Sequence, residues 1–340
     1  MLPFGSRRRA HNLICSGPMV DYSIYYRTTL PLGEPWTKDS WDLFVSAFNS
    51  SERVLSVYRR VRAGRKEWLV FPEYEYKQSE WPRGRCFTQS AGDESDFIQT
   101  FFSSVPLNLG RASICVDITG FIRPHLIFLI KFLFSVGVKR FDLLYSEPVS
   151  YRKKELTEFS SGGAGEVRQV AGYEGVHSTY TAHDILVIGS GYDSDLIVRV
   201  ANHKESAKKI QVLGLPSLRA DFYQQNELRA ALADEAVGDA PPHFASASDP
   251  FSTAALLREI VRKNSRQNPI SNLYLAPLGT KVQVLGFCLF YLFERQNTAS
   301  SIIFPFAPRY DRETTVGISR VWKYTVEAPS APGRRAARRV

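Results

Sequence analysis

Residues 111–148 constrain the fold most, because apolar runs and a polar loop follow one another at the spacing of a strand–helix–strand unit. The parts of this unit are an apolar run Ser113–Val116, the loop Asp117–Gly120 (DITG), a helix over about Pro124–Val136 that Gly137 ends, and a second apolar run Phe141–Tyr145. In such units the loop that leaves the first strand carries the ligand chemistry, because it also opens the helix.

The same succession occurs twice more along the chain. Within residues 183–216 it comprises strand Asp184–Ile188, loop Gly189–Asp195 (GSGYDSD), helix Leu196–Lys204 and strand Ile210–Leu215. Within residues 271–308 it comprises strand Asn272–Ala276, loop Pro277–Lys281 (PLGTK), helix Val282–Glu294 and strand Ser301–Phe306. The three units share no close sequence identity, so they are a recurring architecture and not a proven internal repeat.

Near-continuous apolar strands that alternate with helices predict an α/β fold. We expect a Rossmann-like domain over residues 111–327, with a mainly parallel sheet, helices on both faces and a helical insert at 217–265. Residues 21–110 are predicted to form an N-terminal α+β extension. Residues 1–20 are predicted to be a flexible lead, and residues 328–340 a disordered basic tail.

The helices predicted inside the extension include one in its first part. Trp41, Phe44, Val45 and Phe48 recur at helical spacing, which indicates a helix that starts near Lys38. We interpret these aromatic side chains as core residues and not as ligand contacts.

The net charge of +9 is concentrated at the two ends of the chain. The segment Arg7–Arg9 and four arginines beyond residue 333 carry seven of these charges, which leaves about +2 for the body. The basic ends are therefore either solvated arms or weak contacts for nucleic acid, and the body is not expected to bind nucleic acid by charge alone.

The cysteines and the apolar runs indicate a cytoplasmic protein that does not enter the membrane. Cys15, Cys86, Cys115 and Cys288 are scattered and form no CxxC pair, which favours reduced thiols over disulfides or a zinc site. The longest apolar runs, near Leu126–Val138 and Val282–Phe293, are well short of the roughly 20 residues that a membrane-spanning helix needs.

The three loops are the candidate ligand site. If the strands share one parallel sheet, the loops meet at its carboxyl edge, where small residues and helix N-termini accept phosphate groups. The candidate ligand-binding residues in these loops are Asp117, Thr119, Gly120, Gly189, Gly191, Asp193, Asp195, Gly279, Thr280 and Lys281.

Several of these residues also have a structural interpretation. Asp117, Thr119, Asp193 and Asp195 belong to the residue types that cap helices and turns. Lys281 is harder to explain in this way, because a lysine at the start of a helix opposes the helix dipole. We therefore expect an anion beside Lys281.

Catalysis is a second hypothesis for the same loops. Asp117, Glu147, Asp193 and Asp195 are the candidate catalytic residues of an enzyme that acts on a nucleotide or a phosphorylated small molecule. No metal site is predicted, because the histidines lack HExxH or comparable spacing, and neither a Walker loop nor a complete GxGxxG fingerprint occurs.

The segment around Gly279–Thr280–Lys281, about forty residues long, resembles the C-terminal motif of the CRISPR-associated Rossmann-fold (CARF-like) sensors. In that family a Gly-Thr-Lys-type loop opens a helix and contacts a nucleotide second messenger. The resemblance implies that Thr280 and Lys281 contact such a ligand, with the loop that follows Asp117 beside them. The chain departs from the family at Pro277 and Leu278, where small polar residues are usual.

These observations lead to three hypotheses about function. The first is a nucleotide-binding sensor or scaffold in a prokaryotic defence or signalling system, with a second copy or another protein as its expected partner. The second is the enzyme already described. The third is an interaction subunit of a larger assembly, which docks through residues 217–265 and the aromatic N-terminal region.

Overall fold

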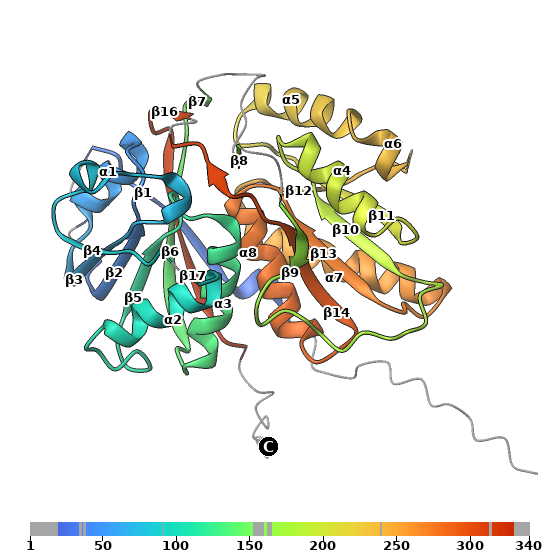
Figure 1. Cartoon of the computed structure of the whole chain (residues 1–340), viewed down its shortest axis with the longest axis horizontal. Helices are drawn as coiled ribbons and strands as arrows, with labels where there is room; N and C mark the ends of the chain where they lie inside the picture. Colours follow the sequence, from blue (N-terminus) through green and yellow to red (C-terminus); the bar gives the residue numbers. More distant parts are fainter. Residues whose placement is uncertain are drawn as a thin grey trace, which may run out of the picture.

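Two β-sheets of mostly parallel strands, each packed against helices, make up the protein (Figure 1). The computed structural model describes residues 20–33, 36, 39–90, 92–151, 160–161, 165–238, 240–312 and 315–329. The predicted N-terminal lead and basic tail lie almost entirely outside these residues. The α/β class expected from the sequence is confirmed.

The first sheet has seven strands in the order β1-β17-β6-β5-β2-β3-β4. Strands β2 to β6 are mutually parallel, whereas β17 runs antiparallel to both β6 and β1. The bounds are β1 Tyr26–Leu30, β2 Trp41–Ala47, β3 Ala63–Leu69, β4 Arg85–Phe87, β5 Ile114–Asp117, β6 Arg140–Glu147 and β17 Arg320–Glu327.

The second sheet has six strands in the order β12-β11-β10-β13-β14-β9. Here β10 to β14 are parallel and β9 is antiparallel to β14. The bounds are β9 Val167–Gln169, β10 Ile185–Gly189, β11 Lys208–Gly214, β12 His243–Ala245, β13 Leu273–Pro277 and β14 Ser300–Pro305. Two short pairs, β7 (Ser150–Tyr151) with β16 (Thr315–Val316) and β8 (Ser160–Ser161) with β15 (Arg309–Tyr310), lie between the sheets.

Helices connect the parallel strands. Their bounds are α1 Glu52–Arg60, α2 Glu94–Ser104, α3 Arg123–Ser135, α4 Ser194–His203, α5 Ala220–Ala231, α6 Asp234–Val237, α7 Pro250–Gln267 and α8 Lys281–Phe290, which continues as a π-helical turn Tyr291–Arg295; short 3₁₀ turns occupy Tyr22–Ile24, Pro72–Tyr74 and Gln78–Glu80. Among the described residues, no helix combines the length and the apolar character that crossing a membrane requires.

Both sheets have the same strand order. In each, the five parallel strands lie in the order third, second, first, fourth, fifth, and an antiparallel strand follows beside the fifth. Strands β5 and β13 are therefore equivalent, as are the helices α3 and α8 that follow them. The DITG and PLGTK loops consequently occupy equivalent places in two different sheets, and not neighbouring places in one sheet as the sequence suggested.

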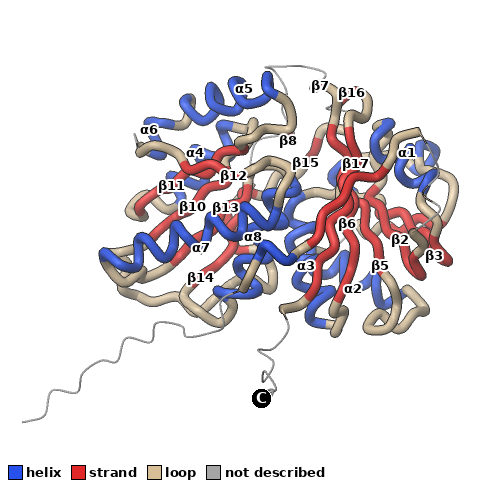
Figure 2. Tube along the Cα trace, turned by 180° about the vertical axis from the view of Figure 1, so that it is seen from behind, coloured by secondary structure: helices blue, strands red, loops and turns tan. Residues whose placement is uncertain are grey.

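The core runs through both halves because α3 and α8 pack against each other between the sheets (Figures 1 and 2). Apart from Lys281, every residue of α8 is buried, and most of α3 is buried as well. This explains the unbroken apolar sequence of the two helices, since each has a sheet on one side and a helix on the other.

Residues 41–47 form a strand, so the helix predicted there is wrong. Residues Trp41–Ala47 form β2, in the middle of the first sheet, and all of them except Asp42 are buried. A parallel strand covered on both faces is apolar almost throughout. Phe44 packs with Val57 of α1 on one face, and Val45 belongs to the core around α2 and α3 on the other. Three of the positions that matched helical spacing, Trp41, Phe44 and Val45, are members of this two-sided strand, and Phe48 follows its end.

Two segments that were expected to be peripheral are parts of the sheets. Strands β1 to β4, from the expected N-terminal extension 21–110, belong to the first sheet together with β5 and β6. The expected insert 217–265 contains β12, which pairs in parallel with β11, and most of α7, which packs on α8. Strands β4 and β12 have three residues each and lie at sheet edges, so they leave little signal in the sequence.

Candidate functional site

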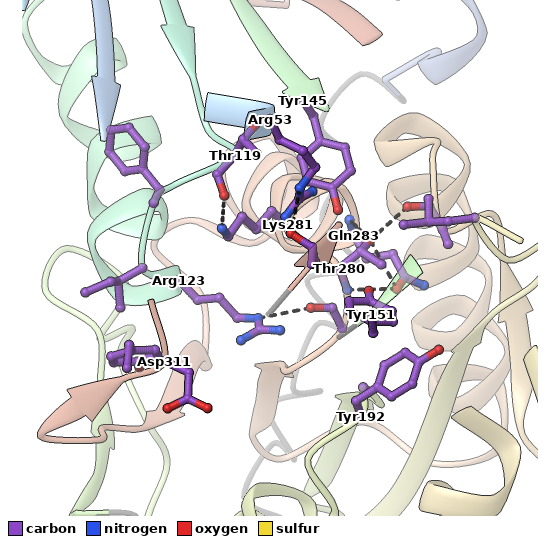
Figure 3. A pocket seen from close by; sticks show the side chains of 18 of the residues that line it. Arg53, Thr119, Arg123, Tyr145, Tyr151, Tyr192, Thr280, Lys281, Gln283 and Asp311 are labelled. Carbon is purple, nitrogen blue, oxygen red and sulfur yellow. Dashed lines mark hydrogen bonds between the residues drawn. The ribbon is translucent and has the colours of Figure 1, made fainter. Parts of the chain in front are cut away.

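A pocket lies where the carboxyl ends of the two sheets face each other (Figure 3). The first half contributes the segments after β2 and β5 together with Tyr145 of β6, and the second half contributes the segments after β10, β11 and β13. Carboxyl edges of parallel sheets are the usual place for ligands in α/β proteins. One chain therefore supplies both walls of this pocket.

Four cationic side chains line the pocket, and all except Arg312 lie at helix N-termini. Arg53 is the second residue of α1, Arg123 the first of α3 and Lys281 the first of α8. Arg53 is buried, and its Nε donates to Thr315 Oγ1 at 3.0 Å. At a helix N-terminus, backbone N–H groups and cationic side chains add to a single positive field.

Two of these cations cross between the halves in a reciprocal way. Lys281, from the second half, donates to the carbonyl oxygen of Thr119 in the DITG loop. Arg123, from the first half, donates through Nε to the carbonyl oxygen of Gly279 in the PLGTK loop at 3.0 Å. The equivalent helices α3 and α8 thus each hold the loop that precedes the other.

Two of these side chains, Arg53 and Lys281, are not paired with a carboxylate among the described residues. Among the described residues, no carboxylate oxygen lies within 4.0 Å of the charged nitrogens of Arg53 or Lys281. Burial, followed by the charges of Arg53 and Arg123, lowers the pKa of Lys281 well below its ordinary value, and the nearby Asp117 opposes this shift only in part. A bound anion would remove the cost of holding these charges together.

A polar side chain beside Lys281 also faces the pocket. Thr280 caps α8 through its hydroxyl, which accepts from the N–H of Gln283 at 3.2 Å and donates to the carbonyl oxygen of Ala247 at 2.8 Å. The side-chain oxygen of Gln283 in turn accepts from the N–H of Thr280 at 3.2 Å. This capping box fixes the N-terminus of α8 at the pocket.

Aromatic rings form the wall on the second half. The ring centroid of Tyr151 lies 5.0 Å from that of Tyr192 and 4.6 Å from that of Phe222. Tyr192 also donates its hydroxyl to the carbonyl oxygen of Phe222 at 3.2 Å. All three residues line the pocket, and burial raises the pKa of Tyr151. A wall of fixed rings suits a flat aromatic ligand group.

The structure brings half of the predicted site residues together. Those that line the pocket are Thr119, Gly191, Gly279, Thr280 and Lys281. Those that do not line it are Asp117, Gly120, Gly189, Asp193 and Asp195, together with the catalytic candidate Glu147.

Asp117 lies beneath the pocket and supports its wall. Its side chain is fully buried, where Oδ1 accepts from the N–H of Thr119 at 3.0 Å and Oδ2 accepts from the hydroxyl of Ser46 at 3.1 Å. Burial raises the pKa of this carboxyl group, although these hydrogen bonds and Lys281 counteract the shift. Asp117 therefore orients the DITG loop and does not reach a ligand directly.

Two loop glycines are required by close backbone contacts and not by a ligand. A Cβ atom at Gly120 would lie 2.1 Å from the carbonyl oxygen of Ala47, and one at Gly191 would lie 2.3 Å from that of Leu278. Gly120 thus joins the DITG loop to the end of β2, and Gly191 joins the GSGYDSD loop to the PLGTK loop. The glycines let loops from neighbouring strands pack at van der Waals distance.

The remaining acidic candidates are dispersed. Glu147 accepts from the indole N–H of Trp322 at 2.6 Å, and burial raises its pKa. Asp193 caps α4 by accepting from the N–H of Leu196 at 3.4 Å, and Asp195 is exposed in the first turn of that helix. Within the described part of the chain, no group of three or more His, Cys, Asp or Glu residues is arranged to hold a metal ion.

Arg53 and Arg123 were missed by the sequence reasoning, although a signal for each exists. Arg123 follows the DITG loop and opens its helix, as Lys281 does after the PLGTK loop. Arg53 opens the helix that follows β2, and it was overlooked because β2 was taken for a helix. Arg53, Arg123 and Lys281 share one pattern, in which a basic residue lies in the first turn of a helix that follows a strand and a short loop.

Comparison of the chain with protein-family models, with curated proteins and with solved structures found no match. The conclusions about function below therefore depend on the geometry of the pocket.

Proposed function

We propose that the protein is a nucleotide-binding sensor or scaffold that holds a phosphate-bearing ligand between two Rossmann-like halves. The observation that carries this proposal is the pair of buried cations, Arg53 and Lys281, that face the pocket with no carboxylate within 4.0 Å among the described residues. Phosphate groups are the ligands that such arginine and lysine clusters at helix N-termini bind best.

The same geometry favours binding over catalysis. The acidic residues predicted as catalytic are not among the residues that line the pocket. Asp117 and Glu147 are instead engaged in buried hydrogen bonds, and Asp193 caps a helix. The aromatic wall of Tyr151, Tyr192 and Phe222 supports a ligand with a flat ring, such as a nucleobase.

The resemblance of the Gly279–Thr280–Lys281 loop to the CARF-like sensors is consistent with this proposal, since Thr280 and Lys281 do line the pocket. On this basis we place the protein in nucleotide signalling, and in prokaryotic defence as the more specific case. A cytoplasmic location belongs to the same proposal and is supported by the free thiols of Cys86, Cys115 and Cys288.

A homodimer or a protein partner is a separate part of the proposal. Both walls of the pocket come from one chain, so a second copy is not needed to build it. One observation that supports a partner is at the end of α5, where Leu228 and Leu232 lie one turn apart and are 65% and 68% exposed. Sedimentation of the purified chain distinguishes a dimer from a monomer.

The proposed function is tested by ligand-induced stabilisation. The purified protein is melted with nucleoside mono-, di- and triphosphates, cyclic dinucleotides, inorganic phosphate and pyrophosphate, and with nucleosides that lack phosphate. A ligand present at 100 times its Kd should stabilise the protein by about 2.7 kcal/mol. Nucleotides are expected to do so and unphosphorylated nucleosides are not.

Arg123→Gln should weaken this stabilisation, because it removes a cation of the pocket. The control is Arg140→Gln at the start of β6, where the side chain is 67% exposed and pairs with Glu327 at 3.4 Å. The proposal fails if no phosphate-bearing compound stabilises the wild-type protein, or if Arg140→Gln weakens stabilisation as much as Arg123→Gln does.

A further inference from the structure

Gln283 carries a hydrogen-bond donor that nothing in the described chain uses. The residue is 1% exposed and lines the pocket one turn into α8 (Figure 3). Its side-chain oxygen accepts from the backbone N–H of Thr280 at 3.2 Å. Because a backbone N–H can only donate, the amide oxygen must face Thr280 and the amide NH₂ group must point the other way. That nitrogen has no hydrogen-bond partner among the described residues.

An unused donor in this position indicates a missing ligand atom. Buried polar atoms in proteins nearly always have a partner, and an unpaired one costs about 1–3 kcal/mol. The capping box holds the amide in place, so the group cannot rotate to find another acceptor without releasing the N–H of Thr280. The matching ligand atom must therefore be a hydrogen-bond acceptor.

The surroundings of Gln283 identify the part of the ligand that carries this acceptor. Glycine backbone surrounds the amide oxygen, because Cβ atoms at Gly214 and Gly279 would lie 3.6 Å and 2.5 Å from it. The aromatic wall of Tyr151, Tyr192 and Phe222 lines the same pocket, and Figure 3 shows Tyr151 and Tyr192 on the side of Gln283. The aromatic wall supplies a stacking surface for a flat ring.

Lys281 and Arg53 lie in a different part of the pocket from the aromatic wall. In Figure 3 they are drawn beside Thr119 and away from Tyr192, whereas the guanidinium group of Arg123 reaches the loop of Gly279. A ligand whose phosphate reaches these cations would direct its base toward Gln283. Base nitrogens and base carbonyl oxygens are acceptors in the plane of the ring, where an amide can reach them.

We propose that Gln283 determines base specificity by donating a hydrogen bond from Nε2 to an acceptor atom of a nucleobase stacked on the wall of Tyr151, Tyr192 and Phe222. This inference rests on the proposed nucleotide-binding function. The ligand class is thus a nucleotide whose base presents an acceptor at this position. A phosphorylated metabolite without a base does not meet this requirement.

Two substitutions separate the donor from the capping role. Gln283→Glu keeps an oxygen for the N–H of Thr280 and replaces the donor by an acceptor, whereas Gln283→Met removes both functions at similar volume. The matched control is Gln211→Glu. Gln211 is also buried, its side-chain oxygen accepts from the hydroxyl of Ser190 at 2.7 Å, and it does not line the pocket.

The readout is the ratio of two Kd values for each variant, measured by calorimetry. One Kd is for the nucleotide that binds the wild type best, and the other is for ribose phosphate with the same phosphate groups and no base. A new carboxylate changes phosphate affinity for both compounds, so the ratio isolates the contact with the base. Circular dichroism confirms that each variant is folded.

We expect Gln283→Met to weaken nucleotide binding about tenfold or more and to leave the Kd for the abasic phosphate within about twofold. Gln283→Glu should in addition reorder the preference among bases, whereas Gln211→Glu should preserve it. Equal losses for both compounds would show that the amide contacts sugar or phosphate, and would overturn the inference. Unchanged ratios in both Gln283 variants would overturn it as well.

Failure of this inference is distinguishable from failure of the proposed function. If the wild type binds the nucleotide and the abasic phosphate equally well, the base contributes nothing and the role of Gln283 is refuted, while phosphate binding stands. If the wild type binds neither compound nor any other phosphate-bearing one, the proposed function itself is refuted.

Discussion

Replacing Lys281 by methionine should weaken ligand binding without weakening the fold. The lysine side chain faces the pocket, and its ammonium group contacts the carbonyl oxygen of Thr119 alone among the described hydrogen bonds. A hydrogen bond between a charged group and a ligand contributes about 1.5–3 kcal/mol. Its loss should raise the Kd for a phosphate-bearing ligand about 10- to 150-fold.

The effect of Lys281→Met on stability should be small because two changes oppose each other. The substitution removes the hydrogen bond to Thr119, but it also removes a buried cation that Arg53 and Arg123 repel. Replacing a buried charge by an apolar side chain of similar volume is often neutral or stabilising. We expect the free energy of unfolding of the ligand-free variant to lie within about 1 kcal/mol of that of the wild type.

Lys66→Met is the matched control for this experiment. Lys66 is half-buried, donates to the carbonyl oxygens of Tyr58 and Val61, and lies 4.2 Å from the ring centroid of Tyr58. Burial alone lowers its pKa, so no neighbouring cation is relieved by its removal. This variant should lose about 1 kcal/mol or more of stability and keep full affinity.

Urea unfolding gives the free energy of unfolding of each variant, and calorimetric titration gives its Kd for the ligand. The reasoning is refuted if Lys281→Met binds ligand as well as the wild type does, since the cation would then not contact the ligand. It is equally refuted if Lys281→Met loses several kcal/mol of stability while Lys66→Met loses none, since Lys281 would then be a structural residue.

Two further predictions concern the charges beneath the pocket. The pKa of Lys281 is lowered in the ligand-free protein, and a bound anion should raise it again. The affinity for the anion should therefore fall as pH rises through the lowered pKa, and binding should take up protons. Calorimetry in buffers of different ionisation enthalpy measures this uptake, and Lys281→Met should show neither effect. Asp117→Ala should cost about 2 kcal/mol or more of stability, because it leaves the N–H of Thr119 and the hydroxyl of Ser46 without their buried acceptor. Asp117→Asn should be nearly as stable as the wild type, with a Kd for the ligand within a few-fold of the wild-type value. A strong loss of binding in Asp117→Asn would contradict the supporting role of this residue.

The sequence predicts the strand–helix units well, because elements that are buried on both faces have continuous apolar runs. The apolar runs of β5, α3, β13 and α8 were recognised, and the loops between them were placed at strand ends. The same property caused the error at β2, since a strand that is apolar throughout can also match the spacing of an amphipathic helix. Without β2, Arg53 could not be recognised as the start of a helix that follows a sheet strand.

The partition into two sheets could not be predicted from the sequence. Strand order depends on which apolar faces meet in three dimensions. Burial requires α3 and α8 to be apolar, but an apolar sequence does not specify which helix or sheet each one packs against. The orphaned donor of Gln283 was equally out of reach, because it follows from the direction of one amide group. Lys281 was identified from sequence alone because a cation at the start of an apolar helix conflicts with the helix dipole, and that conflict is visible in the order of residues.

The equivalent positions of α3 and α8 explain how the fold tolerates this cluster of positive charge. Each helix begins with a cation, and the apolar interface between the helices brings both N-termini to the same pocket. Bringing like charges together lowers stability, whereas burying the large apolar side chains of both helices raises it. A conformation that separates Arg123 from Lys281 would have to open that interface. The cations therefore stay close together in the ligand-free protein, and their positions are set before an anion arrives.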